Sequence, residues 1–287
     1  MKTTRRNLLK VTGLAAGASL FMDPVEALAG TAPKDPSTQL AMLVDTSRCI
    51  GCQSCERACA EKNGLPAVTG QPDSSQRRAT GPEAFTVVND NSTAAGSVFC
   101  KSQCMHCDQP ACVSACLTNA MYKTPEGPVI WREDKCMGCR YCMVACPFDV
   151  PKFEYGSINP RIRKCAMCYD RVTEGQQPAC VDACPQEALL FGQRGQLLTI
   201  ARARIAERPA DYVNHIYGES EVGGTNVLYL AAVPFEELGF RTDLGTVAYP
   251  EHTKTFLYSV PLVLLLGPAF LAGLRQATGS KGGGHHG

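Results

Sequence analysis

Two apolar stretches lie near the ends of this chain of 287 residues. The first, residues 11–21, is too short for the ~20 residues that a membrane-spanning helix needs. The second, residues 256–274, contains no charged residue and would form about 28 Å of helix, close to the ~30 Å of a hydrocarbon core. This pattern predicts one membrane-spanning helix near the C-terminus. A buried core helix is the alternative, although no polar face is visible.

Between these two stretches, the runs of hydrophobic residues are short. Four stretches have the pattern of a regular element: residues 40–44, 129–131 and 227–233 as strands, and residues 197–207 as a helix. Residues 60–97 are polar and rich in Gly, Pro and Ser, with residues 85–88 as the only strand-like patch, so we expect an insertion there. Short strands mixed with one clear helix predict a small α+β fold.

The N-terminal segment has the organisation of an export signal. Arg5 and Arg6 precede the apolar residues 11–21, and Ala27-Leu28-Ala29 is an A-x-A cleavage pattern. The paired arginines followed by N-L-L-K resemble a twin-arginine signal, a type that exports folded proteins. We therefore predict a signal peptide over residues 1–29. A basic N-terminal helix that is retained is the alternative.

The flanks of the C-terminal apolar stretch predict its orientation. Arg275 and Lys281 follow it, which places that end in the cytoplasm by the positive-inside rule, although Lys254 on the other flank reduces the asymmetry. We expect an anchor over residues 253–275 and a cytoplasmic Gly/His tail over residues 276–287. Export of the N-terminal part agrees with this, so the predicted location is the periplasmic side of the bacterial inner membrane.

Composition directs the functional interpretation to the cysteines. The formal net charge of +1 gives no basis for binding nucleic acid. The chain has 17 cysteines, all between Cys49 and Cys184. An odd number at tight spacing in a long chain argues against a disulfide framework, which is typical of short secreted proteins. We therefore expect metal binding.

The cysteines form four groups with related spacing. Groups one and three share gaps of two, two and three residues, the run that bacterial ferredoxins use for [4Fe–4S] clusters. Groups two and four open with a two-residue gap and close with a three-residue gap around a variable loop. In order, the groups are Cys49, Cys52, Cys55 and Cys59; Cys104, Cys107, Cys112 and Cys116; Cys136, Cys139, Cys142 and Cys146; Cys165, Cys168, Cys180 and Cys184. Sixteen ligands suffice for four [4Fe–4S] clusters, and Cys100 is left as a buried free thiol.

Two other metal chemistries compete with this interpretation. Paired C-x-x-C knuckles also bind structural zinc, but the trailing three-residue gap and the Cys-Pro endings favour iron–sulfur clusters. The gaps between Cys100, Cys104 and Cys107 match the signature of radical S-adenosylmethionine enzymes. No run of alternating strands and helices long enough for their barrel follows, so we do not favour that assignment.

Spacing suggests how the groups pair. The nineteen residues between groups two and three suit one ferredoxin-like two-cluster unit (residues 96–146). Groups one and four would then form an outer unit (residues 30–95 and 147–195, with the insertion 60–97). The fourth cysteine of such a run ligates the neighbouring cluster. The predicted sets are Cys104, Cys107, Cys112 and Cys146; Cys116, Cys136, Cys139 and Cys142; Cys49, Cys52, Cys55 and Cys184; Cys59, Cys165, Cys168 and Cys180. Pairing of one with two and three with four remains open from the residues alone.

The cysteine segment resembles a known family. Stretches such as CMGCRYCMVACPFDVPKF and RKCAMC make the chain, from residue 40 to about 192, similar to the four-cluster ferredoxin-type subunits of bacterial membrane oxidoreductases. The segment HIYGESEVGGTNVLYLAAVPFEELGF resembles above all the iron–sulfur subunit of the periplasm-facing [NiFe] hydrogenase-2 type. This resemblance supports two nested two-cluster units. Leu117 stands where the family usually has proline.

The resemblance implies an electron carrier with no catalytic residues of its own. Four clusters would connect a periplasmic catalytic subunit, here the small and large subunits of a [NiFe] hydrogenase, to a multi-helix quinone-reactive membrane subunit. Residues 196–252 would serve as a docking extension, and the C-terminal helix would contact lipid. A formate dehydrogenase, another molybdoenzyme or a multihaem cytochrome complex is the alternative. A more remote alternative is a structural zinc-binding anchor protein.

Overall fold

The structure is a computed structural model that describes residues 35–279. The predicted signal peptide and the end of the Gly/His tail lie outside the described residues. In chain order the strands are β1 (Leu40–Asp45), β2 (Val87–Thr93), β3 (Gly96–Ser102), β4 (Met121–Lys123), β5 (Val129–Trp131), β6 (Lys152–Phe153), β7 (Ile162–Arg163), β8 (Leu189–Gln193) and β9 (Val227–Leu230). The helices are α3 (Ser54–Asn63), α4 (Ala111–Ser114), α5 (Tyr141–Ala145), α6 (Tyr169–Thr173), α7 (Ala179–Asp182), α8 (Arg194–Glu207) and α9 (Tyr249–Gly279), with 3₁₀ turns at Pro36–Thr38, Thr46–Arg48, Glu133–Lys135 and Glu221–Gly223.

A three-stranded sheet in the order β8-β1-β9 forms the centre of the protein. The strand β1 runs antiparallel to β8 and parallel to β9, with Leu43 opposite both Leu190 and Leu228. The predicted strands at 40–44 and 129–131 are confirmed by β1 and β5, and the helix predicted at 197–207 by α8. The strand predicted at 227–233 is confirmed but shorter, because β9 ends at Leu230.

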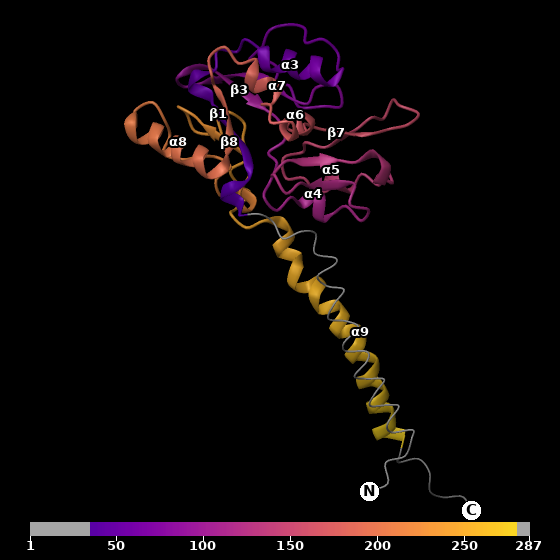
Figure 1. Ribbon diagram of the computed structural model, residues 1–287. Helices are drawn as coiled ribbons and strands as arrows, with labels where there is room; N and C mark the ends of the chain where they lie inside the picture. The colour runs from indigo at the N-terminus through magenta and orange to yellow at the C-terminus, as the bar shows by residue number, and fades with distance from the viewer. Residues whose placement is uncertain (1–34, 280–287) are drawn as a thin grey trace, which may run out of the picture. The chain divides into compact units, whose positions relative to one another are not determined.

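Both faces of the central sheet are buried, because successive residues of a strand point to opposite faces. Met42 and Val44 of β1 pack with Tyr229 into one apolar cluster. Ala41 and Leu43 pack into a second cluster, which α8 covers. Figure 1 shows α8 lying along β1 and β8. Each fully buried aliphatic side chain contributes ~1.5–3 kcal/mol, so this double-sided core is the main source of stability around group one.

The segment expected to serve docking, residues 196–252, is part of this core. All four residues of β9 are buried. The end of α8 is tied to β1, because Arg204 Nη1 donates to Asp45 Oδ2 at 2.6 Å and the Tyr212 hydroxyl donates to the same oxygen at 2.9 Å. Asp45 is fully buried, so these two donors are needed to satisfy its carboxylate.

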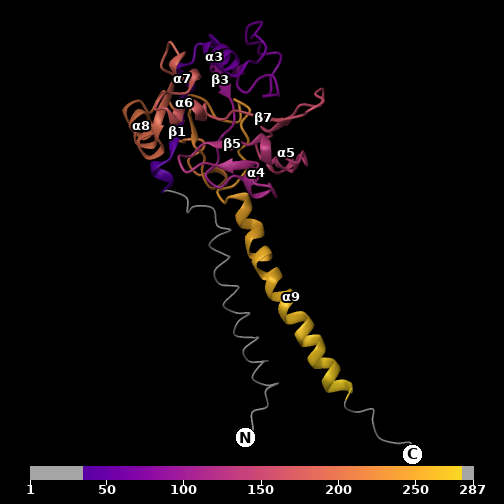
Figure 2. The same cartoon turned by 45° about the vertical axis from the view of Figure 1, so that its right-hand side comes forward.

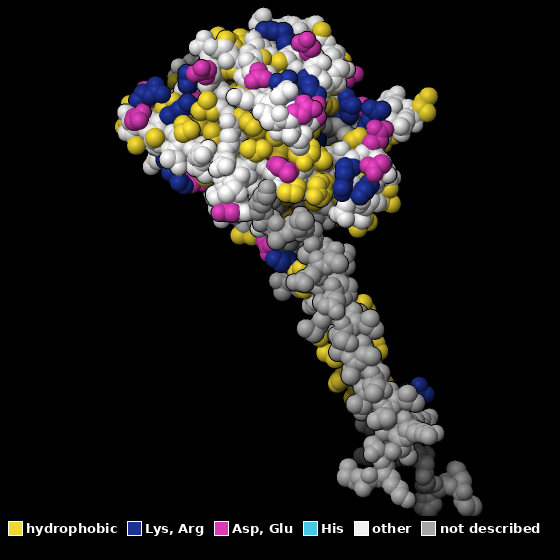
Figure 3. Space-filling model, in the orientation of Figure 1, with side chains coloured by type: hydrophobic (Ala, Val, Ile, Leu, Met, Phe, Trp, Pro, Cys, Tyr) yellow, Lys and Arg dark blue, Asp and Glu magenta, His cyan; other side chains and the backbone are white. Residues whose placement is uncertain are grey.

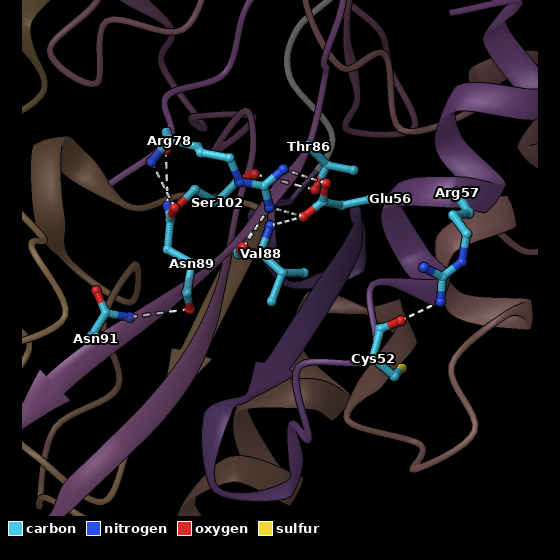
Figure 4. A network of polar contacts seen from close by, with 9 residues as sticks. All are labelled: Cys52, Glu56, Arg57, Arg78, Thr86, Val88, Asn89, Asn91 and Ser102. Carbon is cyan, nitrogen blue, oxygen red and sulfur yellow. Dashed lines mark hydrogen bonds and ion pairs between the residues drawn. The ribbon is translucent and has the colours of Figure 1, made fainter. Parts of the chain in front are cut away.

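The polar insertion is held against α3 by one buried carboxylate. Glu56 of α3 accepts hydrogen bonds from both terminal nitrogens of Arg78 and from the backbone N–H of Val88 (Figure 4). Arg78 and Asn89 also exchange a reciprocal pair of hydrogen bonds at 2.8 and 2.9 Å. The insertion therefore ends in an ordered hairpin, β2–β3, in which Asn89 lies opposite Cys100.

The four helices that contain cysteines lie in two pairs. In both Figure 1 and Figure 2, α3 lies beside α7 and α4 beside α5. The first pair belongs to groups one and four, and the second to groups two and three. Chain segments more than 100 residues apart thus meet at the first pair, as the nested arrangement requires.

The helix α9 is the one helix within residues 35–279 that is long and apolar enough to cross a membrane. The most apolar 18 residues of the candidate span, Tyr249–Arg275, have a mean hydropathy of 2.0, and none of them is buried in the protein. Pro261 and Pro268 lie inside the helix. Helices in membranes tolerate such prolines better than soluble helices do.

Candidate metal centres

The first C-x-x-C loop of each of the four groups shares one backbone feature. The residue before the second cysteine has a positive φ in each: Gly51 (70°), His106 (49°), Gly138 (74°) and Met167 (57°). A left-handed residue turns the chain sharply, so two cysteines three positions apart can face a common centre. The internal repeat in the sequence is therefore also a repeat in conformation.

A second repeated feature follows the last cysteine of groups two, three and four. Asn119, Asp149 and Glu187 each lie three positions after that cysteine and have φ values of 54°, 51° and 48°. Each donates its backbone N–H to the carbonyl of the cysteine, at 3.1, 3.2 and 3.2 Å. Group one differs, because Cys59 lies within α3, which continues to Asn63.

Two cavities are each lined by four cysteines. The first has about 410 Å³ of empty space and is lined by Cys49, Cys52, Cys55 and Cys184, together with Lys101. The second has about 370 Å³ and is lined by Cys59, Cys165, Cys168 and Cys180, together with Gln103. The structure thus brings together the cysteines of groups one and four, although they are distant in the chain.

The remaining eight cysteines also separate into two sets. Burial raises the pKa of Cys107 well above its ordinary value, and the neighbouring thiols of Cys104, Cys146 and Cys112 raise it further. Burial, together with the nearby thiols of Cys116, Cys136 and Cys139, raises the pKa of Cys142 to about 11. Cys139 is the exposed member of the sixteen. Cys146 of group three thus lies near Cys104, Cys107 and Cys112 of group two, and Cys116 of group two lies near Cys136, Cys139 and Cys142 of group three.

The donor chemistry fits iron–sulfur clusters. Each set offers four thiols, the number that a [4Fe–4S] cluster takes. Burial raises the pKa of Cys55, Cys112 and Cys165 to about 12, so these thiols are protonated until a metal binds and displaces the proton. The backbone N–H groups of Met121 and Met167 donate to Cys116 Sγ and Cys165 Sγ, each at 3.3 Å.

The C-terminal segment supports the loop of group two. Backbone N–H groups of Asn226 and Val227 donate to the carbonyl of Met105 at 3.2 and 3.1 Å, and Asp108 donates to the carbonyl of Gly224 at 3.0 Å. This loop therefore lies against the chain just before β9. A change in the conformation of the group-two loop would therefore disturb the chain before β9, and a change there would disturb the loop.

The histidine inside group two is buried rather than on the surface. His106 Nδ1 accepts from the N–H of Val129 at 2.9 Å. Burial lowers the pKa of this imidazole well below its ordinary value, and nearby lysines lower it further. His106 is therefore neutral and helps to hold the loop against β5.

Two buried lysines, Lys101 and Lys164, and the half-buried Lys123 lie near the cysteines and escape prediction from the sequence. Lys101 is fully buried, Lys123 Nζ donates to the carbonyl of Cys107 at 2.9 Å, and Lys164 Nζ donates to the carbonyl of Cys165 at 2.8 Å. A lysine in a short strand ordinarily lies at the surface. A hint in the sequence is that Lys164 directly precedes Cys165 and that Lys101 lies three positions before Cys104.

Cys100 lies on β3 and faces the apolar core that contains Met42 and Tyr229. It is buried, as predicted, and burial raises the pKa of its thiol to about 12. It is not among the residues that line either cavity.

Comparison with known proteins gives concordant matches. The 4Fe-4S dicluster domain family matches residues 96–194. A protein of Nitratidesulfovibrio vulgaris is 45% identical over 96% of this chain and 76% of its own length. The hydrogenase-2 operon protein HybA of Escherichia coli O157:H7 is 35% identical over 92% of this chain and 93% of its own length. The formate dehydrogenase-O iron-sulfur subunit of E. coli K12 is 35% identical over 69% of this chain and 68% of its own length.

These relatives agree with the cysteine spacing and with the residues that the fold gathers. The match to HybA extends through almost the whole of both chains, beyond the cysteine groups alone. The chain therefore belongs to the family of 4Fe-4S dicluster proteins that includes HybA and the formate dehydrogenase iron–sulfur subunits.

Proposed function

We propose that this protein is a non-catalytic electron-transfer subunit that holds four [4Fe–4S] clusters. The observation that carries the proposal is the sorting of sixteen cysteines into four sets of four, two of them around cavities. A bound [4Fe–4S] cluster supplies a one-electron carrier. The chain's own part is to fix the four sets in two pairs, one at α3 and α7 and the other at α4 and α5, and to keep most of the thiols away from water.

The proposed ligands follow these sets. Cys49, Cys52, Cys55 and Cys184 hold one cluster of the outer pair, and Cys59, Cys165, Cys168 and Cys180 the other. Cys104, Cys107, Cys112 and Cys146 hold one cluster of the inner pair, and Cys116, Cys136, Cys139 and Cys142 the other. Cys100 is not a ligand in this proposal. The four clusters would together form a chain of carriers that leads electrons from one end of the protein to the other.

We propose that the inner cluster at Cys139 is a point of exchange with a partner protein. Large apolar side chains surround this set and are exposed: Leu117 (84%), Met137 (64%), Tyr141 (57%) and Val144 (82%). Figure 3 shows hydrophobic side chains on the surface over α4 and α5. Exposed apolar patches of this kind mark protein–protein interaction sites, and a partner covering this one would come close to the exposed Cys139.

The proposed setting is a periplasmic complex at the inner membrane. HybA is described as a hydrogenase-2 operon protein, which supports the small and large subunits of a [NiFe] hydrogenase as the catalytic partner and a quinone-reactive membrane protein as the other. The apolar helix α9 supports a single-pass anchor over residues 253–275 with a cytoplasmic tail. The similarity to formate dehydrogenase iron–sulfur subunits supports a molybdoenzyme as the second candidate.

Anaerobic purification followed by iron, acid-labile sulfide and zinc analysis tests the cofactor. We expect iron and sulfide for four clusters and EPR signals after dithionite reduction. A colourless, EPR-silent protein that contains zinc would contradict the proposal. Co-purified nickel would support the hydrogenase partner, and molybdenum without nickel would favour the second candidate.

A further inference from the structure

A buried lysine separates the two cysteine sets of the outer pair. Lys101 lies on β3 with only 2% of its surface exposed, and its Nζ donates to Gln103 Oε1. The two side chains reach different sites. Lys101 lines the cavity of Cys49, Cys52, Cys55 and Cys184, whereas Gln103 lines the cavity of Cys59, Cys165, Cys168 and Cys180.

The contacts of this pair fix its position. Gln103 is also buried, and its Nε2 donates to the thioether of Met42 at 3.3 Å in the apolar core. Lys101 and Gln103 are two positions apart, so their side chains leave the extended chain on the same side. The Lys101 ammonium group therefore donates to one neutral acceptor, Gln103 Oε1, and lies near the cysteine thiols of both cavities.

The thiols around Lys101 come from both cavities. Cys55 lines the first cavity, whereas Cys59, Cys165 and Cys180 line the second. The Lys101 side chain therefore lies beside cysteines of both sets, in a region from which water is largely excluded. Charges interact far more strongly there than at the surface.

We propose that the Lys101 ammonium group raises the reduction potentials of both clusters of the outer pair. This inference rests on the proposed function, because it requires those clusters. Reduction adds one electron to a cluster that already carries four thiolates, and a nearby buried cation stabilises the added negative charge. Net charge around a cluster is one of the factors that set its potential. Lys101 thereby makes the outer pair easier to reduce.

The test is an EPR-monitored redox titration of the full-length protein in detergent. Lys101→Met and Lys101→Gln both remove the charge and differ in polarity, so one can serve if the other does not fold. Lys101→Arg keeps the charge. Lys135→Met removes the charge of an exposed lysine beside Cys136 and is the matched control. Iron and sulfide content is measured for every variant.

We expect the midpoint potentials of two of the four clusters to become more negative in the neutral variants, with a smaller shift or none in Lys101→Arg and Lys135→Met. A merely structural role would change cluster content or stability without this selective shift. Unchanged potentials in a neutral variant that retains all its iron would overturn the inference. Absence of EPR-active clusters in the unmodified protein would instead refute the proposed function.

Discussion

Arg78 donates a hydrogen bond to Glu56 from each of its terminal nitrogens, at 3.0 and 2.6 Å, although the two residues are separated by 22 positions in the chain. The Glu56 side chain is 2% exposed, whereas that of Arg78 is 35% exposed. Glu56 directly follows Cys55 in α3. This ion pair therefore ties the polar insertion to the helix that carries two cysteines of group one.

Replacing Arg78 should destabilise the protein markedly. In Arg78→Ala, Glu56 keeps the hydrogen bond from the backbone N–H of Val88 but loses its positively charged partner. Leaving a buried charge unpaired costs ~3 kcal/mol at the lower end of the usual range. We expect the apparent Tm, measured anaerobically by circular dichroism, to fall by roughly 6–12 °C.

The control for this ion pair is Arg48→Ala. Arg48 contacts Glu187 at 3.9 Å, and the two side chains are 38% and 80% exposed. Exposed pairs contribute about 1 kcal/mol or less. If both arginine variants lose equal stability, the buried carboxylate is not the anchor of the insertion.

Two glycines in equivalent positions should respond differently to alanine. Gly51 and Gly138 both have a φ near 70°, where a non-glycine residue costs ~1–2 kcal/mol. A Cβ on Gly138 would meet nothing within 4 Å, whereas a Cβ on Gly51 would lie 2.5 Å from the Phe99 ring. We expect Gly51→Ala to cost ~1–3 kcal/mol more than Gly138→Ala, as measured by chemical denaturation.

The double variant Gly51→Ala/Phe99→Leu isolates the steric part of this effect. Removing the ring should recover the additional loss, and the strain at φ should remain. If the double variant is no more stable than the sum of the two single variants predicts, contact with Phe99 is not the cause.

These examples also show which features the sequence predicts. The conformation of the cysteine loops is encoded locally, because a C-x-x-C loop with a left-handed residue turns in the same way wherever it occurs. The register of β1 with β9 is not local: Leu43 and Leu228 are brought together only by packing of both sheet faces. Residues 227–233 are therefore recognisable as a strand in the sequence, but not as the neighbour of residues 40–44.

Lys101 illustrates a second limit of sequence analysis. Its burial depends on thiols contributed by α3, by α7 and by the loop at Cys165, which the fold gathers from separate segments. A single lysine in an alternating strand is ordinarily exposed. Only the three-dimensional arrangement identifies it as a buried cation.

Cys100 should be dispensable for cluster binding. It and Cys59 are similarly buried, at 1% and 8% exposure, but only Cys59 lines a cavity with three other cysteines. We expect Cys100→Ala to retain all its iron and to lose ~1 kcal/mol from the small cavity left behind. Cys59→Ala should lose the iron of one cluster. Equal loss of iron from both variants would make Cys100 a ligand.

Truncation separates the membrane helix from the core. Deleting residues 249–287 removes α9 and leaves β9 intact, so we expect a protein that purifies without detergent and retains its iron. Deleting residues 227–287 also removes β9, whose residues are at most 1% exposed, and the backbone support that Val227 gives to Met105 in group two. This longer deletion should fail to fold, as measured by protease resistance and iron content. If it instead folds with all its iron, residues 227–252 are an appended docking segment rather than part of the core that holds the cysteine groups in place.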